Sequence, residues 1–164
     1  MDFMHDTRDK AGKHDNVEKY LISHGHRFVR SKCFVGDITL IKYQGTSIDL
    51  KRDLQEVIGD FLAKPGQGER FNFFTKECIK AQQFDIRLIF LVEHGGAIRS
   101  IEDVKNWVNP RLKESPYAVS GQRLYKMMRT YSDRYGVEWR FCDKRCTGRV
   151  IVELLSEVNE NRID

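Results

Sequence analysis

Hydrophobic and polar residues follow two periodicities along this chain. The clearest apolar run, IRLIFLVE at 86–93, is nearly continuous, which is typical of a central strand covered on both faces. Before Gly25, apolar residues recur at the three- and four-residue spacing of a helix. These patterns predict strands at 2–6, 33–43, 47–51, 86–93 and 137–142, a helix start at Ser100, and helices at 15–24, 53–62, 69–83, 120–135 and 148–159, the last capped by Thr147.

The order of these elements predicts the fold class. Strands alternate with helices around an early hairpin, so we expect an α/β fold with a mixed central sheet and helices on both faces. A chain of 164 residues fits one domain of ordinary size, and we expect residues 1–164 to form a single domain. An architecture of this kind does not by itself name a function.

Composition narrows the setting in which the chain works. Apolar residues make up 40% and charged residues 32%, and no stretch approaches the ~20 apolar residues needed to cross a bilayer. The N-terminus, MDFMHDTRDK, lacks the apolar stretch of a secretory signal. We therefore expect no membrane partner and an intracellular location, cytoplasmic or nucleoid-associated.

Positive charge is concentrated in the second half of the chain. The net charge is only +4, but residues 99–149 hold 12 Lys and Arg against 6 Asp and Glu. Within them Arg123, Lys126 and Arg129 recur at a spacing that shares one helix face, so they are candidate contacts for nucleic-acid phosphates. Simple solvation of a charged face explains the same pattern equally well.

The four cysteines are too scattered for a disulfide framework, and we expect them to be reduced. Cys142 and Cys146 form a C-x3-C pair. No second pair or nearby histidine completes a four-ligand site, so the sequence does not favour zinc.

The stretch VGDITLIKYQGTSIDLKRDL, residues 35–54, holds the strongest candidates for chemistry. Asp49 and Lys51 are two residues apart on a predicted strand and therefore share a face. With a two-residue turn at Gln44 and Gly45, Asp37 would face away from them. With a three-residue loop that ends in a left-handed Gly45, Asp37 would lie opposite Lys51 and diagonal to Asp49, and a glycine at that position favours this second register.

Two carboxylates across a strand pair can hold a hard divalent cation such as Mg²⁺. The metal would activate a water and neutralise charge on a phosphoryl oxygen, while Lys51 would stabilise the transition state. The ordinary alternative is a surface hairpin with a cross-strand ion pair, and an isolated D-x-K motif is far more often that.

The sequence contains three short motifs in a fixed order, and this is a far more specific signal than a single D-x-K motif. D-T-R-D stands at 6–9, V-G-D at 35–37 and I-D-L-K at 48–51. This order resembles the XPF/Hef-type nuclease domain of the PD-(D/E)XK superfamily, which typically reads Asp-x-Arg-Glu, Val-Gly-Asp and Glu-Arg-Lys. The resemblance covers about residues 3–95 and leaves about 96–164 as a basic extension of the same domain.

The resemblance implies a restriction-endonuclease-like fold and a role for each matching residue. Asp37 and Asp49 would be the metal ligands, and Lys51 the electrostatic catalyst. Asp6 would be a further acidic catalytic residue, and Arg8 a nucleic-acid contact. Four positions depart from the family pattern: Asp9 and Asp49 each replace a glutamate, Leu50 replaces an arginine, and Gln55 replaces an aspartate. Asp49 is chemically equivalent to glutamate as a metal ligand, and the departures bear on substrate contacts and rate.

The leading hypothesis is therefore a DNA endonuclease that depends on Mg²⁺ or Mn²⁺. We expect it to cleave particular DNA structures during DNA repair or recombination. The alternative is a non-catalytic nucleic-acid or protein-binding module on the nuclease fold, and RNA cleavage is a third possibility. The helix-hairpin-helix domain that accompanies many members of the family is not found in this sequence. The resemblance therefore does not by itself imply dimerisation, and a homodimer is left open.

Overall fold

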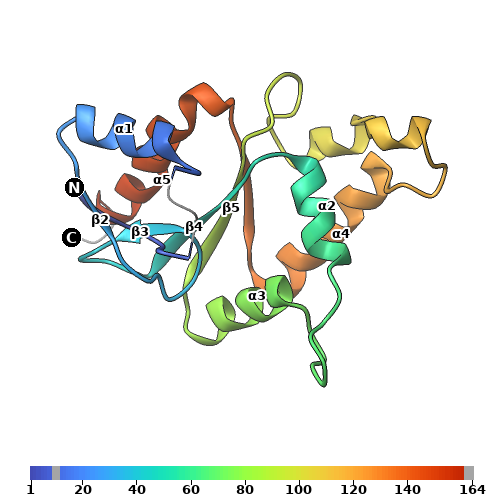
Figure 1. The fold of residues 1–164 in the computed structure, drawn as a ribbon, viewed down its shortest axis with the longest axis horizontal. Helices are drawn as coiled ribbons and strands as arrows, with labels where there is room; N and C mark the ends of the chain where they lie inside the picture. Colours follow the sequence, from blue (N-terminus) through green and yellow to red (C-terminus); the bar gives the residue numbers. More distant parts are fainter. Residues whose placement is uncertain (9–11, 161–164) are drawn as a thin grey trace.

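A six-stranded sheet lies between two layers of helices in the computed structural model, which describes residues 1–8 and 12–160 (Figure 1). The strands are β1 (Asp2–His5), β2 (Arg27–Arg30), β3 (Ile38–Leu40), β4 (Thr46–Lys51), β5 (Arg87–Val92) and β6 (Glu138–Phe141). The α-helices are α1 (Asp15–Ser23), α2 (Leu54–Leu62), α3 (Phe73–Gln83), α4 (Gly121–Tyr135) and α5 (Thr147–Glu160). Three short 3-10 helices complete the description: η1 (Glu102–Asn106), η2 (Pro110–Lys113) and η3 (Lys144–Cys146).

The sheet is mixed, with strand order β2-β1-β3-β4-β5-β6. β3 is antiparallel to both of its neighbours, β1 and β4, whereas β4, β5 and β6 are parallel. It follows that β1 runs in the same direction as β4, and that the carboxyl ends of most strands reach the same edge of the sheet.

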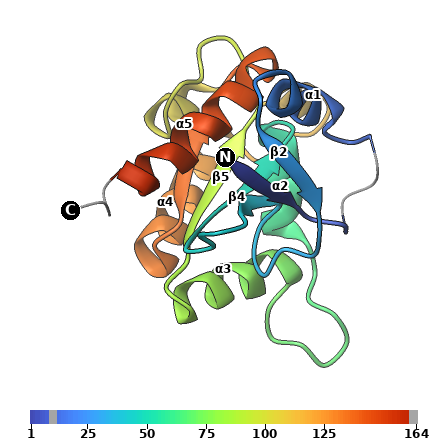
Figure 2. The same cartoon turned by 90° about the vertical axis from the view of Figure 1, so that its left-hand side faces the viewer.

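Each face of the sheet has its own hydrophobic core. The helices α1 and α5 pack on one face, where the core includes Leu21, Ile89 and Leu155. On the other face α2, α3 and α4 surround a core that includes Phe74, Phe90 and Trp139. Figure 2 shows the separation: α1 and α5 lie together on one side of the strands, and α3 lies on the other. The α/β class with a mixed sheet and helices on both faces, expected from the sequence, is confirmed.

The prediction of a long first hairpin strand is wrong. Residues 33–43 were expected to be extended, but β3 spans only Ile38–Leu40. Gly36 interrupts the extended chain with a φ of 68°, and no left-handed residue occurs at Gly45, where the predicted turn required one.

The register of the hairpin also differs from the prediction. The observed pairs are Ile38–Ile48 and Thr39–Ser47, so the chain before β3 continues toward Asp49 and not toward Lys51. The shift is two residues, and because side chains alternate with a period of two, Asp37 still shares a face with Asp49 and Lys51.

Two of three predicted helix starts need correction. The helix expected from residue 69 begins at Phe73, where the Asn72 side chain accepts a hydrogen bond from the Thr75 backbone nitrogen. The helix start expected at Ser100 is confirmed: the Ser100 backbone nitrogen donates to Asp103 Oδ2, the Asp103 backbone nitrogen donates to Ser100 Oγ, and the helix that follows is the 3-10 helix η1. Thr147 is the first residue of α5 and does not cap it, because its hydroxyl donates to Glu93 at 2.6 Å.

One strand, like the 3-10 helices η2 and η3, has no counterpart among the predictions. β2 is a short edge strand parallel to β1, and its burial alternates between exposed and half-buried residues. In the described residues, no helix combines the length and the apolar character needed to cross a membrane.

Candidate active site

The sheet topology gathers polar side chains at one edge. Asp6 follows β1 and Lys51 ends β4, and these two strands run in the same direction. Asp37 precedes β3, which runs the opposite way, so it reaches the same edge from the other direction. Ligand-binding residues of α/β sheets collect at the carboxyl ends of the strands in this manner.

A cavity of about 250 Å³ opens at this edge. We call it the acidic cavity, because its lining holds six carboxylate side chains and three cationic ones. All five residues of the three sequence motifs that were assigned a role line it: Asp6, Arg8, Asp37, Asp49 and Lys51. Asp9, the last residue of the first motif, lies outside the described residues.

Asp37 is positioned by β4. Its backbone nitrogen donates to the Ile48 carbonyl at 2.8 Å, and its Oδ2 accepts a hydrogen bond from the Leu50 backbone nitrogen, also at 2.8 Å. The carboxylate is therefore held against the backbone that follows Asp49, which brings two acidic residues of different strands into one cavity.

Lys51 bridges two carboxylates. Its Nζ lies 2.6 Å from Asp49 Oδ1 and 2.9 Å from Asp60 Oδ2, and 5.5 Å from the ring centres of both Phe74 and Phe90. Burial alone would lower the pKa of this amine, but the two carboxylates outweigh burial and raise it. Lys51 is therefore a permanent positive charge in the cavity.

Asp49 carries the most perturbed carboxyl group of the cavity. Burial, followed by the negative charges of Glu77 and Asp60, raises its pKa to about 6, although the Lys51 ammonium opposes that shift. Only 5% of the residue's surface is exposed. Carboxylates crowded in this way repel one another, and a cation among them would relieve the repulsion.

Asp6 is fixed by its own motif. Arg8 donates from Nε to both carboxylate oxygens, at 2.9 and 3.0 Å, and from a terminal nitrogen at 2.6 Å, while the Cys33 backbone nitrogen donates at 3.0 Å. Burial opposes ionisation of Asp6, but the hydrogen bonds from Arg8 prevail and lower its pKa. The guanidinium of Arg8 thus orients Asp6, and its contact with nucleic acid stays a prediction.

Three acidic residues of the cavity have no counterpart in the sequence motifs. Glu56 and Asp60 come from α2, and Glu77 comes from α3, where its Oε1 accepts a hydrogen bond from the Gly36 nitrogen at 2.9 Å. The four-residue spacing of Glu56 and Asp60, on the helix directly after Lys51, was a usable signal. Glu77 carries no such signal, because only the tertiary packing of α3 brings it to the motif containing Asp37.

The predicted phosphate contacts of α4 do not reach the acidic cavity. Arg123, Lys126 and Arg129 are all exposed, and none lines the cavity. Arg129 lies 3.8 Å from Asp133, a loose ion pair within the helix. Arg123 lines a different cavity, on the opposite side of α2.

The donors of the acidic cavity fit a hard divalent cation in chemistry. Asp37, directly before β3, and Asp49, in β4, offer carboxylate oxygens. Burial, together with repulsion from Glu77 and Asp60, raises the pKa of Asp49, and a divalent cation beside this carboxylate would favour its charged form. Within residues 1–8 and 12–160, no group of three His, Cys, Asp or Glu side chains is already arranged as a metal cluster. A cation would therefore be held by two carboxylates together with backbone oxygen or water.

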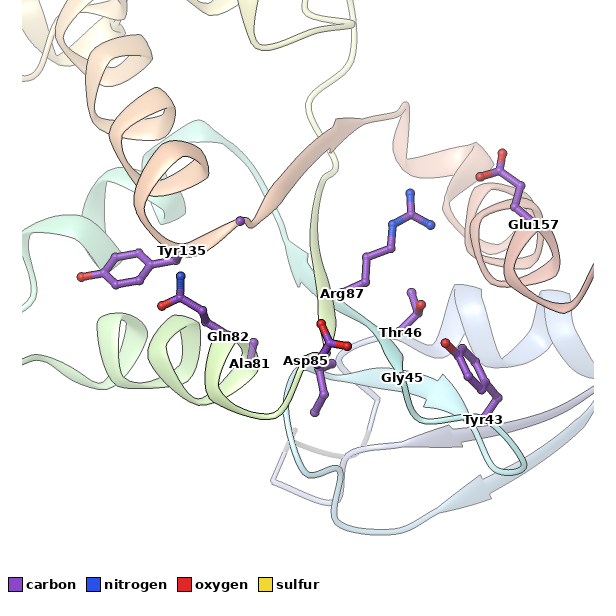
Figure 3. A pocket seen from close by; sticks show the side chains of 11 residues that line it. Tyr43, Gly45, Thr46, Ala81, Gln82, Asp85, Arg87, Tyr135 and Glu157 are labelled. Atoms are coloured by element: carbon purple, nitrogen blue, oxygen red, sulfur yellow. The ribbon is translucent and has the colours of Figure 1, made fainter. Parts of the chain in front are cut away.

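A larger cavity, of about 730 Å³, lies elsewhere (Figure 3). Thr46 and Arg87, the first residues of β4 and β5, line it, so it is found at the opposite end of these strands from Asp49 and Lys51. The Arg87 side chain donates two hydrogen bonds to the Glu138 carboxylate, from Nε at 2.6 Å and from a terminal nitrogen at 2.9 Å. None of the motif residues lines this cavity. Although it is the larger of the two, it is not the candidate active site.

Comparisons with known proteins identify solved structures that share this fold. No protein-family model and no curated protein matches the sequence. Among solved structures, XPF from Aeropyrum pernix matches with a TM-score of 0.65 and 16% sequence identity, over 99% of this chain and 67% of that chain. A complex of XPF from Aeropyrum pernix with DNA matches with a TM-score of 0.63 at the same identity, over 99% of this chain and 66% of that one. The chain therefore has the same α/β fold as XPF from Aeropyrum pernix.

Proposed function

We propose that this chain is a divalent-metal-dependent endonuclease that hydrolyses DNA phosphodiester bonds. One observation carries the proposal: Asp6, Asp37, Asp49 and Lys51 come from three separate sequence motifs and line one cavity. The fold is similar to that of XPF, and one of the similar structures is a complex with DNA. A repair or recombination role and a single nuclease domain over residues 1–164 belong to the same proposal.

Each residue of the acidic cavity has a role in this proposal. Asp37 and Asp49 would hold Mg²⁺ or Mn²⁺, and the bound ion would supply a water of lowered pKa and neutralise charge at a phosphoryl oxygen. Lys51 places a buried positive charge where negative charge develops in the transition state. Asp6, oriented by Arg8, is the additional acidic group.

A plasmid-nicking assay with Mg²⁺ or Mn²⁺ tests the proposal. We expect the wild type to nick the plasmid and Asp49→Ala to lose about 10²-fold or more in rate, because a buried ligand and charge partner is removed. Asp133→Ala is the matched control, since it removes an equal charge from an exposed position on α4. Cleavage by Asp49→Ala at the wild-type rate would refute the site, and an equal loss in Asp133→Ala would show that the effect is not specific.

A second candidate function is a non-catalytic nucleic-acid or protein-binding module on the same fold. It is favoured by the engagement of Lys51 with Asp49 and Asp60, and by the absence of a ready three-residue metal cluster from the described residues. Calorimetry with Mn²⁺ separates the two functions: absence of metal binding together with intact DNA binding would favour the module. Running the nicking assay beside an RNA substrate tests the third possibility, RNA cleavage.

A further inference from the structure

The larger cavity, of about 730 Å³, differs in character from the acidic cavity (Figure 3). It opens at the amino ends of β4 and β5, where Thr46 and Arg87 begin these strands, and we call it the amino-end cavity. Its volume lies within the range of small-molecule sites, ~300–1,000 Å³. None of the residues with a role in the proposed hydrolysis lines it, so a ligand held there would be separate from the nuclease site.

Three helices end at the amino-end cavity. Gln82 lies in the last turn of α3, Tyr135 is the last residue of α4, and Glu157 lies in the last turn of α5. The Gln82 side chain donates a hydrogen bond to the Arg134 carbonyl at 2.9 Å, which fixes the ends of α3 and α4 against each other. The carbonyl groups at a helix C-terminus carry a partial negative charge, so all three helices make this cavity favourable to a cation.

Carboxylates add full negative charges to these partial ones. Asp85 follows α3 and Glu157 belongs to α5, and these two helices cover opposite faces of the sheet. The Asp85 carboxylate makes no hydrogen bond or ion pair with any residue that the structure describes. Within the described residues Arg87 is the one cationic side chain that lines the cavity, and both oxygens of Glu138 accept hydrogen bonds from it. The cavity therefore keeps an excess of negative charge.

Thr46 carries an unused hydroxyl on the wall of the amino-end cavity. The residue is only 1% exposed, and Figure 3 shows its side chain between those of Arg87 and Tyr43. Its hydroxyl makes no hydrogen bond with any residue of 1–8 or 12–160, although its carbonyl accepts one from the Thr39 hydroxyl at 2.7 Å. A buried hydroxyl without a hydrogen bond costs free energy, and an ammonium group would donate one to it.

We propose that the amino-end cavity binds a linear polyamine, an organic cation with several ammonium groups along one chain. One ammonium group pairs with Asp85 and another with Glu157, and the Thr46 hydroxyl accepts a hydrogen bond from the same molecule. Tyr43 and Tyr135 line the cavity as well, and the faces of aromatic rings attract ammonium groups. A single ammonium group would meet only one of two carboxylates that come from opposite faces of the sheet, which favours a cation of several charges.

Isothermal titration calorimetry of the whole chain, without DNA or metal, tests the proposal. The probes are spermidine, putrescine and butylamine, which carry three, two and one ammonium groups. We expect spermidine to bind most tightly and Kd to rise about fivefold for each ammonium group that is lost, because each loss removes a charge-assisted contact. Equal affinity for spermidine and butylamine would overturn the proposal.

Three variants identify the site. Asp85→Asn and Glu157→Gln each remove one negative charge at almost constant size, and each should weaken spermidine binding about tenfold. Asparagine also tolerates the left-handed φ of 52° at residue 85. Thr46→Val keeps the shape of the side chain and should weaken spermidine binding about threefold. Its Tm should not fall, because no hydrogen bond within the described residues is lost, and this separates a ligand contact from a structural role.

Two further variants are matched controls for the calorimetry. Glu153→Gln removes an equal charge from an exposed position of α5 outside the amino-end cavity, and Asp37→Asn removes one from the acidic cavity. Both should bind spermidine as the wild type does. Unchanged binding by Asp85→Asn and Glu157→Gln would overturn the proposal, and so would an equal loss in Glu153→Gln. A loss confined to Asp37→Asn would overturn it by placing the polyamine in the acidic cavity. None of these results depends on whether the chain cleaves DNA.

Discussion

At the scale of single residues, the acidic cavity holds charges that cost stability. Asp49 keeps its proton to a higher pH in the folded chain than in the unfolded one, because its pKa is raised to about 6 from an ordinary value near 4. The folded state therefore binds more protons in that window, and the free energy of unfolding falls as the pH rises from about 4 to about 6. Buried charge networks of this kind are weak evidence for a stabilising role.

Asp60→Asn tests how the carboxylates act on one another. The substitution removes a negative charge near Asp49 and leaves Lys51 with Asp49 as its remaining carboxylate contact, and both effects should lower the pKa of Asp49 below about 6. Carboxyl ¹³C NMR titration of the metal-free protein measures it. Glu56→Gln is the control, because Glu56 lines the same cavity but is not among the largest causes of the raised Asp49 pKa. An Asp49 pKa that stays at the wild-type value in Asp60→Asn would contradict the assignment.

The residues of the sequence motifs could be predicted to meet, but their neighbours could not. Asp37 was expected opposite Lys51, and the observed register turns it toward Asp49. The prediction of a shared face was nevertheless right, because the face depends only on whether the loop length is odd or even. Glu77 reaches the acidic cavity only because α3 packs beside Gly36, and no local sequence pattern predicts that packing.

At the scale of elements, Gly36 lets the segment before β3 approach β4 closely. A Cβ at this position would lie 2.5 Å from Ser47 Oγ and 3.0 Å from the Ile48 carbonyl oxygen. The left-handed φ of 68° is a second reason for glycine here. The close approach precedes Asp37 directly, so it helps to hold that carboxylate against β4.

We predict that Gly36→Ala lowers the free energy of unfolding by about 2–4 kcal/mol, from backbone strain plus a steric clash. Gly68→Ala is the matched control, because Gly68 has a φ of 75° and nothing within 4 Å of an added Cβ. It should cost about 1–2 kcal/mol, from strain alone. Urea unfolding measures both variants, and equal losses would show that the approach to β4 is not tight.

Prediction of elements succeeded where the hydrophobic pattern was long. β5 was predicted from its continuous apolar run, and α4 from a helical pattern that ends at Gly136 with its left-handed φ. β2 was not predicted, because it is an edge strand of only four residues with an arginine at each end and therefore has no long hydrophobic pattern. The 3-10 helix η2 was not predicted: it begins at Pro110, and its capping residue Asn109 is buried by tertiary contacts.

At the scale of the whole molecule, a cation in the acidic cavity would couple to folding. A ligand that binds only the folded state raises the free energy of unfolding according to its concentration relative to Kd. The repulsion around Asp49 is the cost that the cation would offset.

We predict that Mn²⁺ at about 100 times its Kd raises the Tm of the wild type by roughly 5–10 °C, since about 2.7 kcal/mol of binding energy is gained. Asp37→Asn should abolish most of this shift, whereas Asp133→Asn, on the surface of α4, should preserve it. Differential scanning calorimetry with and without Mn²⁺ gives the comparison. A shift of equal size in Asp37→Asn would place the cation elsewhere.

The two edges of the sheet have a consequence for assembly. β2 carries an arginine at each end and β6 carries the exposed Arg140, and both strands are only four residues long. Short edge strands with charged side chains discourage pairing with the edge of another sheet. Two copies of this chain would therefore associate through helix or loop surfaces and not by extending one continuous sheet, which also protects the protein against edge-to-edge aggregation at high concentration.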